Sequence, residues 1–259
     1  MDKKPHLLII NDDGIHAPGI KSLWKSLVEL YTVTIIAPAI EQSGVGLAIT
    51  LRKPLHIEKV SWEKDTIAWK VTGTPADCVK MALSVILDSP PDLIVSGINR
   101  GDNSGRNVLY SGTVGGVIEG TLRNVPGVAF SCADFDNPQF HVAERYVPQI
   151  VKYLLEHPMP KGTFLNVNFP DHPDGIRGMK LARQGRGYWM ENPDQRIHPE
   201  GRPYYWLGGK WGHQDENDES DVALLKKGFI TAVPIHVEEL TNHDLLNSRK
   251  AHFEDIIRL

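Results

Sequence analysis

The chain has 259 residues, of which 41% are hydrophobic and 23% charged, a composition typical of a globular protein that buries a sizeable core. A formal net charge of −4 lacks the basic character of proteins that bind polymeric nucleic acid, so we expect no DNA or RNA partner. The sequence shows neither a signal-peptide core nor an apolar run long enough to cross a membrane, which predicts a cytoplasmic protein without a membrane partner. Its two cysteines, Cys78 and Cys132, lack the spacing of a zinc or redox pair and are expected to be buried free thiols.

The first predicted element is a short strand, Leu7–Ile10, followed at once by acidic residues. Four consecutive apolar residues indicate a strand buried on both faces, as in a parallel sheet covered by helices. Asp12 and Asp13 follow its carboxyl end, where open α/β sheets bind their ligands. Two adjacent carboxylates repel each other, and a divalent metal is the simplest compensation. Since Asn, Asp and Gly also dominate turns, the alternative is that residues 11–14 form only a turn.

The following segments continue the alternation of helix and strand. Residues 17–30 carry apolar side chains at helical spacing, and Val33–Ala37 is a β-branched, apolar strand. The loop 39–46 then occupies the same carboxyl edge as the two acids. Ser43 lies in that loop and is the second candidate ligand.

An excursion and a second helix come next. Residues 49–60 and 66–71 are expected to be extended. Thr74, followed by a proline and then by Asp77 three residues after the cap, predicts a helix start with a capping box. Asp77 is therefore interpreted as a capping residue and not as a catalytic one.

A third strand and a third helix offer further polar groups. The strand Leu93–Val95 leads into residues 96–105, a loop of small hydrogen-bonding residues. Ser111–Thr113 precede an apolar helix expected over Val114–Leu122, whose N-terminus is a natural phosphate site. The alternative is that Ser111 and Thr113 only cap this helix, and both can hold at once.

The alternation predicts an α/β fold: a Rossmann-like, doubly wound, mostly parallel sheet. A strand at 128–131 and a helical pattern over 142–155, expected to start near Pro138 and to be perturbed by Pro148, continue it. Residues 186–219, rich in Gly, Pro, Asn and aromatics, break it and are expected to form an extended C-terminal β-hairpin arm used in oligomerisation, within one domain spanning 1–259. A terminal helix is expected over 247–259, with Phe253, Ile256, Ile257 and Leu259 on its apolar side.

Polar residues follow three of the predicted strands: Asp12 with Asp13, then Ser43, then Asn99. Carboxylate, hydroxyl and amide oxygens suit Mg²⁺ or Mn²⁺ and lack the His and Cys of a zinc site. A metal held with open positions can bind a phosphoryl oxygen and activate water, which predicts phosphate-ester hydrolysis. An aspartyl-phosphate mechanism with Asp12 as nucleophile is less favoured, because the acid required two residues later is Gly14.

Five ordered motifs closely resemble those of the stationary-phase survival protein SurE family. They are Asn11–Ile15, Glu41–Gly44, Thr72–Val79, Val95–Gly101 and Tyr110–Val114, and the late stretch from Ser220 to Thr231 resembles the ending of that family too. The resemblance covers essentially the whole chain and is densest before Ser131.

The resemblance implies a cytoplasmic, metal-dependent nucleoside 5'-monophosphate phosphohydrolase, a 5'-nucleotidase with one divalent cation, Mg or Mn. It also implies a Rossmann-like core and a hairpin that builds homodimers or homotetramers. By similarity, the metal ligands are Asp12, Asp13, Ser43 and Asn99, and Asp12 and Asp13 are catalytic. The residues expected to face the substrate phosphate are Asn11, Asn103, Ser111, Gly112 and Thr113.

Two other functions fit the same residues. One is a broad phosphatase acting on 3'-nucleotides or short polyphosphate, because the site grips the phosphoryl group and not the base. The other is a non-catalytic nucleotide-binding sensor, which would bind nucleotide without releasing phosphate.

Overall fold

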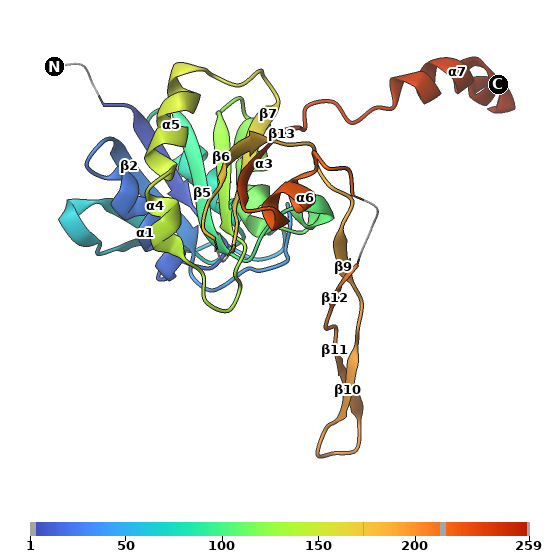
Figure 1. Ribbon diagram of the computed structural model, residues 1–259, viewed down its shortest axis with the longest axis horizontal. Helices are drawn as coiled ribbons and strands as arrows, with labels where there is room; N and C mark the ends of the chain where they lie inside the picture. The colour runs from blue at the N-terminus through green and yellow to red at the C-terminus, as the bar shows by residue number, and fades with distance from the viewer. Residues whose placement is uncertain (1–3, 173, 213–215, 258–259) are drawn as a thin grey trace.

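The computed structural model of the protein describes residues 4–172, 174–212 and 216–257. Within these residues the chain forms a nine-stranded sheet in the order β3-β4-β2-β1-β5-β6-β7-β13-β8 (Figure 1). Its strands are β1 (His6–Ile10), β2 (Thr32–Pro38), β3 (Ile57–Val60), β4 (Ile67–Val71), β5 (Leu93–Arg100), β6 (Gly127–Cys132), β7 (Thr163–Phe169), β8 (Gly178–Leu181) and β13 (Phe229–His236).

The centre of this sheet is parallel and its edges are not. All strands from β4 to β7 in the sheet order run in the same direction. At one edge β3 pairs antiparallel with β4, and at the other β13 pairs antiparallel with β7 and parallel with β8. The prediction of a mostly parallel, doubly wound sheet is therefore confirmed.

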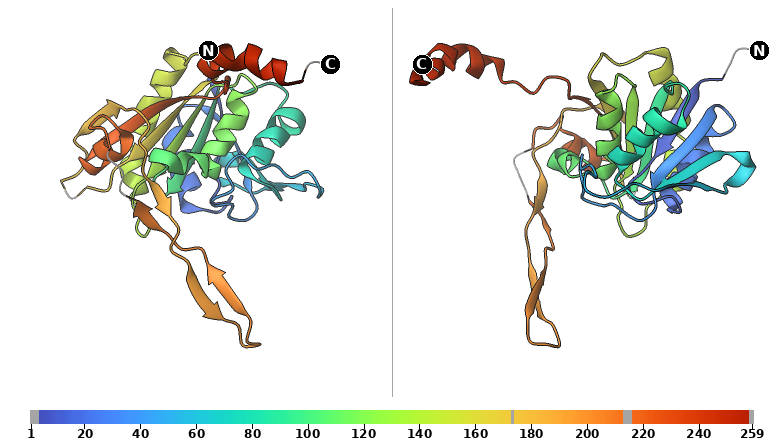
Figure 2. Two further views of the ribbon diagram at one scale, coloured as in Figure 1. Left: turned by 90° about the vertical axis from the view of Figure 1, so that its right-hand side faces the viewer. Right: turned by 180° about the vertical axis from the view of Figure 1, so that it is seen from behind.

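Helices cover both faces of the sheet (Figure 2). Along β1, Leu7 and Ile9 pack into one hydrophobic core while Leu8 and Ile10 pack into the other, and all four are fully buried. This two-sided burial explains the uninterrupted apolar run. The first core is closed by α1 (Pro18–Leu27), α4 (Phe140–Glu144) and α5 (Val147–Glu156), and the second by α2 (Pro75–Met81), its π-helical continuation η2 (Ala82–Ile86) and α3 (Gly112–Thr121).

Several predicted boundaries are wrong. The strand expected to end at Val95 continues to Arg100, with a shift of register between Ser96 and Asn99, so Asn99 lies on β5 and not in a loop. The perturbation expected at Pro148 is confirmed: the pattern over 142–155 forms two helices, because Pro148 lacks the N–H that a continuous helix needs and instead occupies the first turn of α5. Of residues 49–60 only β3 is a strand. Two short 3₁₀ turns are η1 (Glu63–Asp65) and η3 (Gly105–Leu109).

The predicted arm is a long β-hairpin that protrudes from the body (Figures 1 and 2). At its root β9 (Tyr188–Met190) pairs with β12 (Lys210–Gly212), and towards its tip β10 (Asp194–Ile197) pairs with β11 (Pro203–Trp206), all antiparallel. Residues 213–215 of the predicted arm lie outside the described residues.

The chain ends in a helix that extends away from the body (Figure 1). After α6 (Asp221–Lys226) and β13, it forms α7 (His243–Glu254) and a final turn, η4 (Asp255–Ile257). The helix begins earlier than the predicted residue 247, because the Asn242 side chain caps it by accepting from the Leu245 N–H at 2.9 Å. Residues 258–259 lie outside the described part. Phe253 and Ile256, expected on an apolar side, are 74% and 66% exposed. None of the described helices is long and apolar enough to cross a membrane.

Candidate metal and phosphate site

The candidate site lies where the order of the strands in the sheet reverses, at β1. From β1 the chain builds β2 on one side and later β5 on the other, so the segments that leave β1 and β2 diverge from the end of β5. Such a switch point is where doubly wound sheets bind ligands. Asp12 and Asp13 follow β1, Ser43 follows β2, and Asn99 lies near the end of β5.

Asp12 is held by the N-terminus of α3. Its side chain is 3% exposed and accepts a hydrogen bond from the Thr113 hydroxyl. A Cβ atom at Gly112 would lie 2.7 Å from the Asp12 Cβ and 3.0 Å from its Oδ2, so only glycine permits this approach. Burial raises the pKa of Asp12, and hydrogen bonds from the Thr113 hydroxyl and from the N–H groups of Asp12 and Thr113 oppose that shift.

Asp13 lies among charged groups. Burial, and then the negative charges of Asp12 and Glu41, raise its pKa to about 7. The positive charge and the backbone N–H of Arg100 act in the opposite direction. Two adjacent carboxyl groups that resist ionisation need a cation if both are to be charged, which fits a bound divalent metal.

The chemistry of the nearby donors fits a metal bound by oxygen. In the part of the chain that the structure describes, no group of three or more His, Cys, Asp or Glu is arranged to hold a metal ion. A metal at Asp12 and Asp13 would therefore complete its coordination with other oxygen atoms, such as hydroxyl, amide or water oxygens. Ser43 and Asn99 carry donors of this type.

Ser43 is hydrogen-bonded to Glu41, and Asn99 is hydrogen-bonded to the backbone at Arg100. The Ser43 hydroxyl donates to Glu41 Oε1 at 2.7 Å, and the same oxygen lies 3.9 Å from Nη2 of Arg100. The Asn99 side-chain amide donates to the carbonyl oxygens of Arg100 at 3.3 Å and Gly101 at 2.8 Å. The backbone N–H of Arg100 in turn bonds Asp13.

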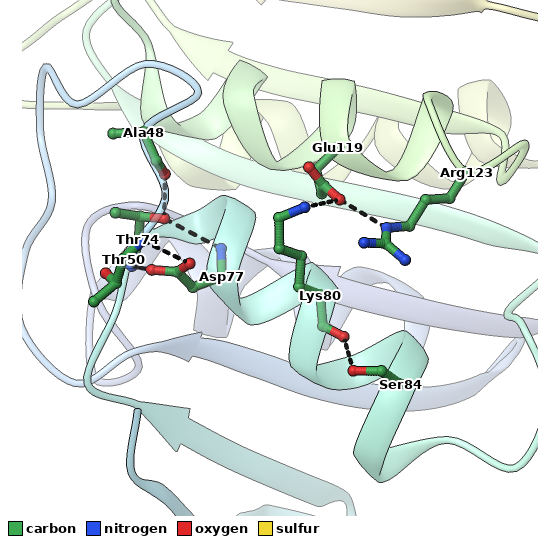
Figure 3. Close-up of polar contacts among 8 residues, drawn as sticks. All are labelled: Ala48, Thr50, Thr74, Asp77, Lys80, Ser84, Glu119 and Arg123. Carbon is green, nitrogen blue, oxygen red and sulfur yellow. Dashed lines mark hydrogen bonds and ion pairs between the residues drawn. The ribbon is translucent and has the colours of Figure 1, made fainter. Parts of the chain in front are cut away.

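The loop that carries Ser43 is pinned by the two helices of the second core. A Cβ at Gly115 of α3 would lie 2.2 Å from the Gly46 carbonyl oxygen, so loop and helix are in close contact. The α2 capping box holds the end of the same loop: the Thr74 hydroxyl donates to the Ala48 carbonyl at 2.6 Å, and Asp77 accepts from the Thr50 N–H at 3.0 Å (Figure 3). The interpretation of Asp77 as a capping residue is confirmed.

A buried ion pair ties the two helices together. Glu119 of α3, with a side chain only 8% exposed, accepts from Lys80 of α2 and from Arg123, each at 2.7 Å (Figure 3). The helix that bears on Asp12 and the helix that holds the Ser43 loop are therefore braced against each other.

The residues expected to face phosphate divide into two groups. Ser111, Gly112 and Thr113 lie at the start of α3 beside Asp12, and Ser111 also caps the helix by accepting from the Val114 N–H at 3.2 Å. The amide group of Asn11 donates to the Gly14 carbonyl at 3.0 Å. Asn103 is 6% exposed, and its amide donates at 2.8 Å to the hydroxyl of Ser131, which pairs with Asn99 in the sheet, inside a buried polar cluster with Asn166 and Asn168.

Three residues near or below the site carry no assignment from the sequence. Glu41 stands two residues before Ser43 and Arg100 directly follows Asn99, and both lie within motifs that carry the family resemblance, Glu41–Gly44 and Val95–Gly101. Asp221, fully buried, accepts from the N–H groups of Gly105 at 3.0 Å and Gly185 at 2.7 Å, and joins η3 to the root of the hairpin. Nothing in the local sequence predicts that role.

The fold and the site together define a Rossmann-like α/β protein with two adjacent acidic residues at its switch point, of which the first is buried beside the N-terminus of a helix. The family described as "Survival protein SurE" matches residues 7–191. The "5'-nucleotidase SurE" of Protochlamydia amoebophila (strain UWE25) is 53% identical to this chain, covering 99% of it and 100% of the relative. The protein of the same name from Moorella thermoacetica (strain ATCC 39073 / JCM 9320) is 42% identical and covers 92% of each.

A solved structure agrees with these sequence matches. The crystal structure of the SurE protein from Aquifex aeolicus superposes with a TM-score of 0.82 at 37% sequence identity, covering 96% of this chain and 100% of that one. The chain belongs to the SurE family, and the resemblance read from its motifs is confirmed.

Proposed function

We propose that this protein is a 5'-nucleotidase, a metal-dependent phosphoric monoester hydrolase that releases phosphate from nucleoside 5'-monophosphates. The observation that carries the proposal is the contact between the buried carboxylate of Asp12 and the N-terminus of α3 at the switch point, with Asp13 next to it in the chain. Relatives that share up to 53% of their residues with this chain over its whole length bear the name 5'-nucleotidase.

The residues that would hold the metal are Asp12, Asp13, Ser43 and Asn99, and their oxygen donors favour one Mg²⁺ or Mn²⁺. When bound, the metal supplies positive charge to the phosphoryl group and makes water nucleophilic at neutral pH. The chain itself contributes position: free N–H groups at the start of α3 bind a phosphate. Thr113 fixes the Asp12 carboxylate through its hydroxyl and favours its ionised form against the effect of burial.

We further infer a homodimer or homotetramer built through the hairpin of a single-domain chain. Trp189, Tyr204, Tyr205 and Trp206 are each more than 40% exposed on an element that protrudes from the body (Figure 1). Large aromatic side chains are enriched in protein interfaces. Tyr188 and Trp211 are half-buried at the root of the hairpin, where Arg106 stacks on Tyr188 and Trp211 contacts Trp189.

A cytoplasmic location stays a prediction. Cys78 and Cys132 are both buried free thiols, as expected, and this supports a reducing compartment. Burial raises the pKa of the Cys132 thiol to about 12, so it is not a reactive thiolate.

The test is phosphate release from a panel of nucleoside 5'- and 3'-monophosphates and short polyphosphate, with Mg²⁺, with Mn²⁺ and with chelator. We expect phosphate release from 5'-monophosphates, and we expect it to require metal. In Asp13→Asn the rate should fall more than about a hundredfold, which exceeds the loss caused by removing a residue that only supports a metal ligand. Asp65→Asn, which removes an exposed carboxylate elsewhere, is the matched control and should keep full activity.

Other outcomes would contradict the proposal in distinct ways. Faster release from 3'-monophosphates or polyphosphate would indicate the broader phosphatase. Nucleotide binding without release of phosphate from any substrate would indicate the sensor.

A further inference from the structure

Arg100 is the last residue of β5, next to the candidate metal ligand Asn99. Its backbone N–H bonds the Asp13 carboxyl, and it directly follows Asn99. Its side chain is 43% exposed, and Nη2 lies 3.9 Å from Oε1 of Glu41. The guanidinium group therefore stands beside the acids that hold the metal in the proposed function.

The side chain of Arg100 is held in place by Phe135. The guanidinium carbon lies 4.4 Å from the centroid of the Phe135 ring, a cation–π contact. Phe135 in turn packs on the same strand end, since a Cβ at Gly101 would lie 3.2 Å from its Cδ2. The ring is itself 57% exposed, so the pair forms a positioned cation on the surface of the protein.

The hydrogen-bond donors of this guanidinium are not used. Among the residues that the structure describes, none accepts a hydrogen bond from it, because the Glu41 oxygen at 3.9 Å is too distant and already accepts from Ser43. A guanidinium carries five donors in a planar fork that matches the oxygens of a phosphate. The strand end thus presents a positioned guanidinium whose donors are open to a ligand, next to the candidate metal ligands.

We propose that Arg100 binds the phosphoryl group of the substrate and that the aromatic ring of Phe135 positions its guanidinium group. This inference rests on the proposed function for the identity of the substrate, a phosphate monoester. The ligand that suits this guanidinium is a phosphate dianion. It would give the guanidinium charged hydrogen-bond acceptors, which the Glu41 carboxylate at 3.9 Å does not provide. Glu41 then acts as a positioning residue that keeps the guanidinium of Arg100 directed at the candidate metal site.

The experiment measures binding of inorganic phosphate by calorimetry to the Mg²⁺-saturated protein. In Arg100→Gln the affinity should fall on the order of ten- to a hundredfold, the loss expected for hydrogen bonds to a charged group. Arg145→Gln removes an exposed positive charge outside the site and should leave the affinity unchanged. Phe135→Leu should weaken binding only a few-fold, because the cation remains and its platform is lost.

A second variant separates recognition from folding. Arg100→Lys keeps the charge and the aliphatic stem but not the fork, so its phosphate affinity should lie between those of wild type and Arg100→Gln. Melting temperatures of the metal-free variants should match wild type, since a merely structural role of Arg100 would lower them. Phosphate affinity within about twofold of wild type in Arg100→Gln would overturn the inference.

The inference and the proposed function fail separately. A protein that binds phosphate through Arg100 but hydrolyses no nucleotide refutes the function and leaves the phosphate contact in place. A nucleotidase whose Arg100→Gln variant keeps full phosphate affinity refutes the contact and leaves the function in place.

Discussion

The hydroxyl of Thr113 donates a hydrogen bond to the carboxylate of Asp12, although the two residues are 101 positions apart in the chain. The bond spans two structural layers, because Asp12 leaves the central strand β1 and Thr113 lies in the first turn of α3. It gives a buried carboxylate a fixed direction and favours its ionised form.

Removing this hydroxyl should therefore impair the site more than the fold. We expect Thr113→Val to lower kcat/KM for nucleoside 5'-monophosphates roughly ten- to a hundredfold, the value of a hydrogen bond to a charged group. Thr113→Ser keeps the hydroxyl and should retain most of the activity. Steady-state kinetics of both variants test this, and equal loss in both would refute a role of the hydroxyl.

Adding one methyl group at Gly112 should displace Asp12. The new Cβ would lie 2.7 Å from the Asp12 Cβ and 3.1 Å from the Gln42 carbonyl oxygen, closer than atoms tolerate. We expect Gly112→Ala to lower Mg²⁺ affinity and activity together. Gly120→Ala on the same helix is the control, because its Cβ meets only the end of the Ile94 side chain at 2.2 Å, so its cost should fall on stability alone. Titration calorimetry with Mg²⁺ distinguishes the two, and unchanged metal affinity in Gly112→Ala would contradict the expectation.

Asp221 should make stability depend on pH. Burial raises its pKa, while the N–H groups of Gly185, Gly105 and Val222 oppose the shift. A carboxyl group whose pKa is higher in the folded state contributes stability that is complete below its unfolded pKa of about 4 and is lost as pH rises through its folded pKa. The stability difference between wild type and Asp221→Asn should thus be most favourable to wild type near pH 3.5 and shrink towards pH 7. Urea unfolding at several pH values measures it, and a difference that grows with pH would show that the hydrogen bonds outweigh burial.

Shortening the hairpin should change the mass of the protein in solution. A Cβ at Gly208 would lie 2.3 Å from the Asn192 carbonyl oxygen, so these two residues are adjacent across the hairpin. Joining them directly removes β10 and β11 and leaves the paired root of β9 and β12 intact. We expect a smaller assembly by light scattering with the phosphatase site retained. The full-length double variant Tyr205→Ser, Trp206→Ser controls for deletion, and an unchanged mass in both proteins would refute the role of the arm.

The sequence was sufficient for the features that depend on local patterns. The two-sided burial of Leu7–Ile10, the capping box at Thr74 and the polar residues after β1 and β2 all follow from spacing and residue type. The end of β5 did not, because Gly97 with φ of 122° and the shift of register at Asn99 are imposed by pairing with β6. Local propensity predicts a loop there, and tertiary pairing extends the strand.

Contacts between distant segments were beyond local reasoning. Thr113 was interpreted as a cap or a phosphate contact, and its bond to Asp12 requires knowing how α3 lies against β1. Arg100 gains its setting from Phe135 and Glu41, which come from different loops. The buried position of Asn103 depends on Ser131, and that of Asp221 on Gly105 and Gly185. Such placements arise from topology, which residue periodicity does not encode.

The long separation between Asp12 and Thr113 also orders events during synthesis on the ribosome. The two carboxylates are made before their partners, because the helix that fixes one of them and the strand that carries Asn99 emerge about a hundred residues later. Parallel strands cannot pair until the crossover between them has been made, so an unfinished chain holds its acids without their partners. Tight metal binding should therefore appear only after α3 has been made. Its appearance would show that the parallel strands have paired and that α3 has packed on them.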